Sequence, residues 1–489
     1  MTEISTLRPA RHTALPDGRL PETGTRLDRA LSGLLIVLSA FPYAGIAVGG
    51  DTNIPVSSVL AGILVLRAIR YLPLFAIAVV LAAVPFFSAF IRLFLTSDPL
   101  QLIPTITWVA ATLALPGAAA AVLFLRRRAI AWLSWTLIGS AGYAVVQKLV
   151  FIDRLDTIPF MWLYTLPGYA NMSDFADTFL LYVRRPFGFF PETSFMVGSV
   201  TLMAMVLIVL LRHYGMTPSW LEWSAVGLAV WAAAISGSGS AVVVVAVVAM
   251  AIILPVAIRQ AWLFLLGVPA AALGAAWVAS SVLQERSESF NWSWADRGSS
   301  VQAVVKRLME DPIAFWGGLG RGNVNQEFVS GRMPLETFQH YNPIPDVYSV
   351  LGRIIAENGM LVGGLTVAGM GLLILRSGGR VPPLIGVLHV LTWVVVAGAT
   401  ISYDNAFWLW GGAGAALGLE LTRRWPEEPV PDGRRIRSTA EIEDDFDRRQ
   451  DLLDAPAGAV AAHPRGGGSS AAAAAARSDD GAGAAPWDR

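Results

Sequence analysis

The sequence predicts an all-α fold, a polytopic membrane bundle of about twelve spanning helices. The first observation is composition: 54% hydrophobic residues, 15% charged residues and a mean hydropathy of +0.55 are too apolar for a soluble chain of 489 residues. The second is a recurrence of apolar stretches long enough to cross the roughly 30 Å hydrocarbon layer of a bilayer. The third is the placing of basic residues in alternate connections between these stretches.

The candidate spans follow one another along most of the chain. They cover residues 30–48, 54–69, 71–95, 102–125, 129–151, 193–211, 219–236, 239–258, 261–283, 347–375, 382–402 and 404–421. The second is the weakest, because it is short and carries Arg67 and Arg70 at its end. The first does not read as a cleaved signal, since a long polar segment precedes it and no small-residue cleavage site follows.

The basic residues also predict an orientation. They stand at Arg26 and Arg29, Arg67 and Arg70, Arg126–Arg128, Arg212, Arg259, Arg376 and Arg380, and Arg423 and Arg424. The positive-inside rule then places both termini in the cytoplasm and the two longest loops, 152–191 and 284–346, outside. The chain thus divides into a cytoplasmic N-terminal tail (1–29), a transmembrane bundle (30–421) and a C-terminal tail (422–489), whose low-complexity composition predicts disorder.

Composition also excludes several classes of function. The 36 basic and 36 acidic residues balance, so there is no electrostatic reason to expect nucleic acid as a partner. The chain has no Cys, which rules out disulfides, thiol catalysis and cysteine-ligated metal, and five His residues do not suggest a histidine-rich metal site. We therefore expect no cofactor and no metal.

The first outside loop ends with two arginines and a carboxylate next to the sixth span. Arg184, Arg185 and Glu192 are candidates for a pyrophosphate pocket, because guanidinium groups grip phosphate oxygens in a bidentate way. Many aromatic residues share this loop. They equally fit an interfacial aromatic belt with basic anchors, and the sequence leaves both interpretations open.

The second outside loop contains a predicted helix followed by a glycine run. Val301, Val304, Val305, Leu308 and Met309 have helical spacing. Ser299 or Ser300 is the expected cap and Pro312 lies just past the expected end, so the helix presents Arg297 and Arg307 near the membrane surface. The run Trp316–Asn323 contains four glycines, which either let backbone approach a ligand closely or form a flexible turn.

The loop ends with Arg332 and His340, and a new helix is expected to begin with Asp346 as its N-cap. On that helix Asp346, Ser349, Arg353 and Glu357 are three or four residues apart and share one stripe. Ionisable residues at the membrane usually face a polar cavity, although an Arg353–Glu357 ion pair at the boundary would explain the same spacing.

Taken together, these segments resemble the O-antigen ligase and polymerase family of polyprenyl-linked glycan transferases. The resemblance covers about residues 150–420 and rests on four short elements, each weak alone, in the family's order. They are Phe189-Phe-Pro-Glu192-Thr-Ser194 entering a span, Ser236-Gly-Ser238-Gly239-Ser240, the glycine pattern from Pro312 to Gly322, and Glu357-Asn-Gly359.

The resemblance implies a GT-C-like bundle at the outer face of a bacterial plasma membrane, which transfers a glycan from polyprenyl pyrophosphate to a sugar hydroxyl. A chain-length regulator is a further candidate partner. The expected phosphate- or glycan-binding residues are Arg184, Arg185, Arg297, Arg321, Arg332, Tyr348 and Arg353. The expected catalytic carboxylates and imidazole are Glu192, His340, Asp346 and Glu357.

The sequence departs from the family pattern at three places, and these bear on the choice between polymerase and ligase. Thr193 stands where members commonly have Pro, and Gly239 stands where many have Arg. Tyr348-Ser349 occupies the place of the ligase branch's His-Asn pair. The sequence therefore favours a repeat-unit polymerase over a ligase, with a twelve-span transporter or glycolipid flippase as the alternative from another class.

Overall fold

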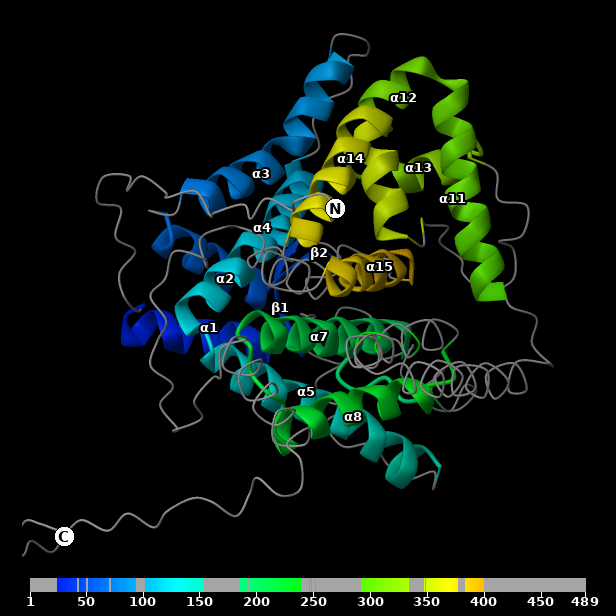
Figure 1. The fold of residues 1–489 in the computed structure, drawn as a ribbon. Coiled ribbons are helices and arrows are strands. Elements are labelled where there is room, and N and C mark those ends of the chain that lie inside the picture. The colour runs from blue at the N-terminus through cyan, green and yellow to red at the C-terminus, as the bar shows by residue number, and fades with distance from the viewer. Residues whose placement is uncertain are drawn as a thin grey trace, which may run out of the picture. The chain divides into compact units, whose positions relative to one another are not determined.

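The computed structural model describes residues 24–41, 44–49, 52–69, 72–93, 102–153, 185–190, 193–238, 246, 248, 251, 292–333, 347, 349–376 and 383–399. Over these residues the fold is mostly helical, which confirms the predicted class (Figure 1). Five helices are long and apolar enough to cross a membrane. The expected spans 239–258, 261–283 and 404–421 and both tails lie wholly or mostly outside the described residues.

The N-terminal region contains two short helices joined by a β-hairpin. The elements are α1 (Arg26–Leu38), β1 (Gly45–Gly49), β2 (Thr52–Pro55) and α2 (Val56–Arg67), and β1 pairs antiparallel with β2. The prediction of one continuous span over 30–48 is therefore wrong. A proline follows Phe41 and glycines begin and end β1, and these residues favour extended and turn backbone over helix.

The next helices follow the expected spans closely. They are α3 (Leu72–Leu93), α4 (Leu102–Leu125), α5 (Arg128–Val146) continued by a π-helical turn, η1 (Gln147–Ile152), then α7 (Thr193–His213) and α8 (Trp220–Ala234). A capping box formed by Ser219 and Glu222 starts α8. Helix α7 is buried along its whole apolar window, packed by α5, α8 and α15, so it is the centre of the main hydrophobic core.

Three further helices form a separate unit of packing beside α14. They are α11 (Trp292–Glu310), α12 (Pro312–Gly317) and α13 (Val324–Val329), and they share a second hydrophobic core with the start of α14 (Figure 1). The expectation that Ser299 or Ser300 caps the first of these helices is wrong, because α11 begins at Trp292 and both serines lie inside it. Helix α11 ends at Glu310, just before Pro312, as predicted. Asp311 caps α12 instead, accepting hydrogen bonds from the N–H groups of Ile313 (2.9 Å) and Ala314 (3.3 Å).

Helix α14 (Val350–Arg376) is bent at Gly359, whose φ of 81° and ψ of 169° are not helical. The bend brings the two arms of α14 close together. A Cβ at Gly363, in the second arm, would lie only 2.8 Å from the carbonyl oxygen of Ile354 in the first arm. The helix begins at Val350 rather than after Asp346, since the Ser349 hydroxyl accepts a hydrogen bond from Gly352 N–H (3.2 Å) as a cap does. Helix α15 (Pro383–Ala399) packs against α14 and α7.

Large apolar side chains cover the outside of several of these helices. Exposed examples are Val79, Val80, Phe86, Phe87 and Phe90 on α3, Trp220, Trp223 and Trp231 on α8, and Leu361, Leu365 and Leu372 on α14. Water-soluble proteins rarely expose so much apolar surface, whereas lipid tails cover it at no cost. The surface and the five apolar helices together agree with a membrane protein.

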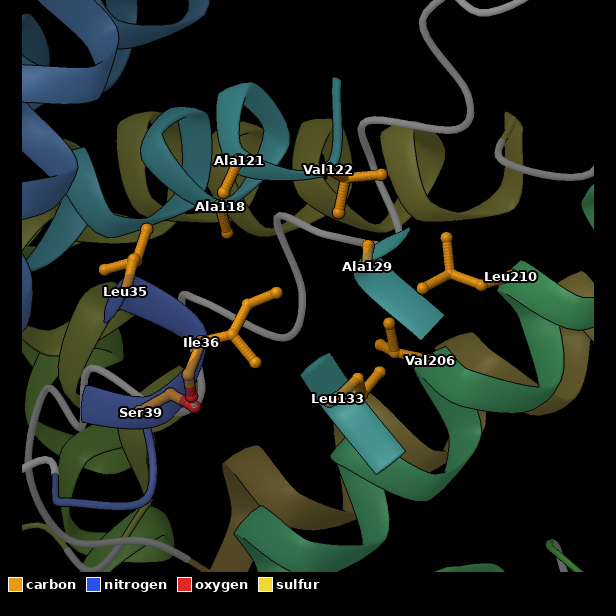
Figure 2. Close-up of a pocket in the computed structure, with 10 residues that line it drawn as sticks. All are labelled: Leu35, Ile36, Ser39, Ala118, Ala121, Val122, Ala129, Leu133, Val206 and Leu210. Carbon is orange, nitrogen blue, oxygen red and sulfur yellow. Dashed lines mark hydrogen bonds between the residues drawn. The ribbon is translucent and has the colours of Figure 1, made fainter. Parts of the chain in front are cut away.

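An apolar pocket lies between α1, α4, α5 and α7 (Figure 2). Its lining residues are Leu35, Ile36, Ser39, Ala118, Ala121, Val122, Ala129, Leu133, Val206 and Leu210. Ser39 is the only lining residue with a side-chain oxygen, and it donates its hydrogen bond to Ile36 O. The pocket therefore suits hydrocarbon and offers no group for catalysis.

Candidate functional site

Two arginines hold one buried carboxylate next to the bend of α14. Arg321 Nη1 pairs with Glu357 Oε2, and Arg353 Nε lies 3.3 Å from Glu357 Oε1. The side chains of Arg321 and Glu357 are 3% and 1% exposed, and that of Arg353 is 19% exposed. The Arg353–Glu357 pair expected from helical spacing is thus formed, and Arg321 joins it from a segment far away in the sequence.

The start of α4 forms a wall that fixes the Arg321 guanidinium. Pro104 O accepts hydrogen bonds from Arg321 Nη2 (2.8 Å) and Nε (3.3 Å). The Trp108 ring lies 5.0 Å from Arg321 Cζ, a cation–π distance, and Trp108 Nε1 donates to Leu81 O at 2.8 Å. Protein groups therefore hold Arg321 on several sides. Its main role in this geometry is to keep the Glu357 carboxylate in place.

The glycine run of the second outside loop is fixed to the bend of α14 by its backbone. Leu319 N donates to Ala356 O (2.7 Å), and Gly320 N donates to Glu357 O (3.1 Å), so the run is held rather than a free turn. Gly318 has a φ of 75°, and a Cβ there would lie 2.5 Å from Gly359 N. These glycines therefore allow a close approach to the backbone of α14, whereas the expected close approach to a ligand stays a prediction.

The C-terminal end of α3 completes the site. Ser88 Oγ donates to Gly317 O at 2.5 Å, which ties α3 to the glycine run. One helical turn later, Arg92 lies against the same run, with its side chain next to Gly317 and Gly320. Among the described residues, three guanidinium groups (Arg92, Arg321, Arg353) and one carboxylate thus gather where α3, α4 and α14 meet.

A second carboxylate, Glu327, organises the charges of the helices that cover this site. Arg307 Nε lies 3.0 Å from Glu327 Oε2, Arg332 Nη2 lies 2.8 Å from Glu327 Oε1, and Arg307 Nη1 lies 3.2 Å from Asp311 Oδ2. Burial lowers the pKa of the Arg307 guanidinium, but the hydrogen bond and charge of Glu327, with help from Asp311, outweigh it and raise that pKa overall. Arg332 remains exposed on the surface of this unit.

The end of the first outside loop is described only from Arg185 onward. Gln147 Oε1 accepts hydrogen bonds from Phe187 N and Gly188 N, both at 2.8 Å, which anchors the segment on η1. The side chains of Phe187 and Phe190 are buried in the protein, so these two do not form an interfacial belt. Phe189 is half-buried and stacks on Tyr143, with ring centroids 4.4 Å apart, and the other aromatic residues of this loop, within 160–182, lie outside the described residues.

Arg184, Glu192, His340, Asp346 and Tyr348 lie outside the described residues, and Arg297 lies in α11 with an undescribed side chain. The described ranges contain no group of three or more His, Asp or Glu side chains that could hold a metal ion.

Some residues of the site were not predicted. Glu327, Trp108 and Arg92 enter it through tertiary contacts, and no local pattern marks the first two. Arg92 did carry a signal, because it is a basic residue at an end of a span that the expected topology places outside, against the positive-inside bias.

Electrostatics indicates what this site can bind. A buried guanidinium needs compensating negative charge, and the single carboxylate of Glu357 is shared by two arginines. Guanidinium groups at the end of α3 suit an anionic ligand, because they pair with phosphate or carboxylate oxygens.

The fold and this site define the class: a helical membrane protein with a buried arginine–glutamate centre under a separate helical unit. No protein-family model matches the chain, and no curated protein is significantly similar to it.

Proposed function

We propose that this chain polymerises polyprenyl-pyrophosphate-linked oligosaccharide repeat units of an exopolysaccharide, capsule or O-antigen. It would be a GT-C-like bundle of about twelve spans in a bacterial plasma membrane, with both termini in the cytoplasm. The observation that carries the proposal is the pairing of Arg321 and Arg353 with the buried Glu357, next to the glycine run against which Arg92 lies. Such a site suits a pyrophosphate headgroup whose lipid tail stays in the bilayer.

In this reaction a glycosidic bond forms between the anomeric carbon of the donor glycan and an acceptor sugar hydroxyl. The bond from that carbon to the pyrophosphate oxygen breaks, the hydroxyl proton passes to a base, and polyprenyl pyrophosphate leaves. Arginines stabilise the leaving group because its negative charge grows in the transition state. Glu357 orients Arg321 and Arg353, and since both its oxygens are engaged, His340, Asp346 or Glu192 is the better candidate for the base.

The expected orientation supports an outer-face site. The end of α3, the start of α4 and the glycine run come from three stretches that the positive-inside rule assigns to the same side. We predict that a reporter fused after Gly318 is active only outside the cytoplasm, and that one fused after Arg424 is active only inside. Cytoplasmic activity of the Gly318 fusion would rule out an outer-face enzyme.

The function itself is tested by reconstituting the purified protein with a polyprenyl-pyrophosphate-linked oligosaccharide. We expect long polymer and stoichiometric release of polyprenyl pyrophosphate. Arg353→Lys should slow polymer formation by at least about tenfold, because lysine keeps the charge but loses the planar fork that grips two oxygens. Arg127→Lys, at the turn between α4 and α5, is the matched control and should act as wild type. Wild-type protein that releases no polyprenyl pyrophosphate would exclude both a polymerase and a ligase.

Transport of a lipid-linked glycan is the second candidate, and one observation favours it. Discontinuous helices beside charged groups are typical of transporter binding sites, and α14 is broken at Gly359 beside Glu357. The same liposomes distinguish the two functions. A flippase would move the labelled glycolipid between leaflets without lengthening its glycan, whereas a polymerase would lengthen it.

A further inference from the structure

We propose that Arg92, at the end of α3, is a pyrophosphate-binding residue of this site. The inference rests on the proposed function, because it assigns a further contact to the same anionic headgroup. It extends that function to a helix that none of the sequence motifs includes.

The position of Arg92 is fixed by its helix. Ser88, one turn earlier on α3, donates to Gly317 O and Glu357 O at 2.5 and 3.4 Å, so this face of α3 is tied to the glycine run and to the bend of α14 together. Residues four apart lie on the same face of a helix. Arg92 is therefore directed to the same backbone as Ser88.

The glycines opposite Arg92 leave the room that its side chain occupies. A Cβ at Gly317 would lie 2.8 Å from Arg92 Cγ, and a Cβ at Gly320 would overlap Arg92 Nη1. Arg92 thus lies across the run that also carries Arg321, and Glu357 accepts from the backbone of that run. Guanidinium groups from α3 and from the loop are brought together at one place.

The two guanidinium groups differ in access. Arg321 is almost fully buried and engaged by Glu357, Pro104 and Trp108, whereas Arg92 is only half-buried. Phe86, Phe87 and Phe90, each more than half exposed, lie on the opposite face of α3, where apolar side chains face lipid. A headgroup at the end of α3 would thus meet the more exposed Arg92 before Arg321, and Arg321 would keep the site in shape.

The test measures binding of two probes, inorganic pyrophosphate and polyprenyl pyrophosphate, to the full-length protein in nanodiscs at several salt concentrations. We expect Arg92→Gln to lower the affinity for both probes by about tenfold, which is the effect of losing one charged hydrogen bond. It should also make binding of both probes less dependent on salt. Arg92→Lys should keep the salt dependence and lose less affinity. Tighter binding of the polyprenyl form than of the free anion would identify the lipid headgroup as the ligand.

Two controls separate binding from folding. Arg127→Gln removes an arginine far along the chain and should leave both affinities unchanged. Ser88→Ala loosens the tie between α3 and the glycine run without removing charge, so it should lower the melting temperature but keep the salt dependence. The inference would be overturned if Arg92→Gln bound both probes with wild-type affinity. It would also be overturned if Arg92→Gln and Ser88→Ala lost the same affinity and both kept the wild-type salt dependence. Either result would leave the proposed function standing. A wild-type protein that binds neither probe would overturn the proposed function as well.

Discussion

Replacing Glu357 with Gln is expected to destabilise the protein by about 3 kcal/mol and to abolish polymer formation. Its carboxylate is 1% exposed and compensates two guanidinium groups, of which Arg321 is itself 3% exposed. Without that charge the buried Arg321 loses the carboxylate that compensates its positive charge, which costs more than a surface pair contributes. The measurement is the melting temperature of the purified variant together with polymer length in cells.

The second buried carboxylate provides a matched control for this prediction. Glu327→Gln also removes a charge shared by two arginines, but the side chain of Arg332 is 55% exposed and water can solvate it. Its melting temperature should therefore fall less than that of Glu357→Gln. Combining Glu357→Gln with Arg321→Met should restore part of the stability, because the uncompensated charge is removed. If the double variant were less stable than Glu357→Gln, charge compensation would not be the reason.

Replacing Gly359 with Ala is expected to have a comparably large effect, because the bend of α14 has no room for a side chain. The residue has a φ of 81° and a ψ of 169°, a region that essentially only glycine occupies and that costs another residue roughly 1–3 kcal/mol. In addition, a Cβ would lie 2.6 Å from Gly318 N and overlap Trp316 O, which are backbone atoms and cannot rotate away. The glycine run must then separate from α14, so we expect loss of both the Arg321–Glu357 contact and activity.

The same helix supplies the control. Gly364 and Gly369 lie in the second arm of α14, and nothing stands within 4 Å of a Cβ at either position. Alanine should be neutral or slightly stabilising there, by up to about 1 kcal/mol, because glycine weakens a helix interior. The variants are compared by melting temperature and by polymer formation in cells. Full activity and normal melting of Gly359→Ala would show that the bend does not hold the site together.

Part of the candidate site could be predicted because its residues are close in sequence. Arg353 and Glu357 are one helical turn apart, so their pairing follows from helix geometry alone. The glycine run was recognisable as a place of close backbone approach, because only glycine adopts positive φ freely. What it approaches was not predictable, since Gly318 packs against Glu357, and Gly320 N donates to Glu357 O, between segments nearly forty residues apart.

The errors have a common physical cause. The span over 30–48 and the cap at Ser299 or Ser300 were inferred from hydrophobicity and residue type within a short window. Hydrophobicity does not distinguish one long helix from a short helix followed by a β-hairpin, and serine is tolerated inside a helix that packs well. Where tertiary packing determines the ends of a helix, the propensities of the local residues do not predict them.

The sequence by itself determined the helical membrane class of this protein, because burial of long apolar segments in lipid depends on composition and length, which are local properties. The tertiary structure alone decided which charges meet. Arg92, Trp108 and Arg321 come from three different elements, and each contact depends on how α3, α4 and the glycine run pack around the bend of α14. A charge pattern along the chain carries no such information, since electrostatic energy depends on separation and burial in space.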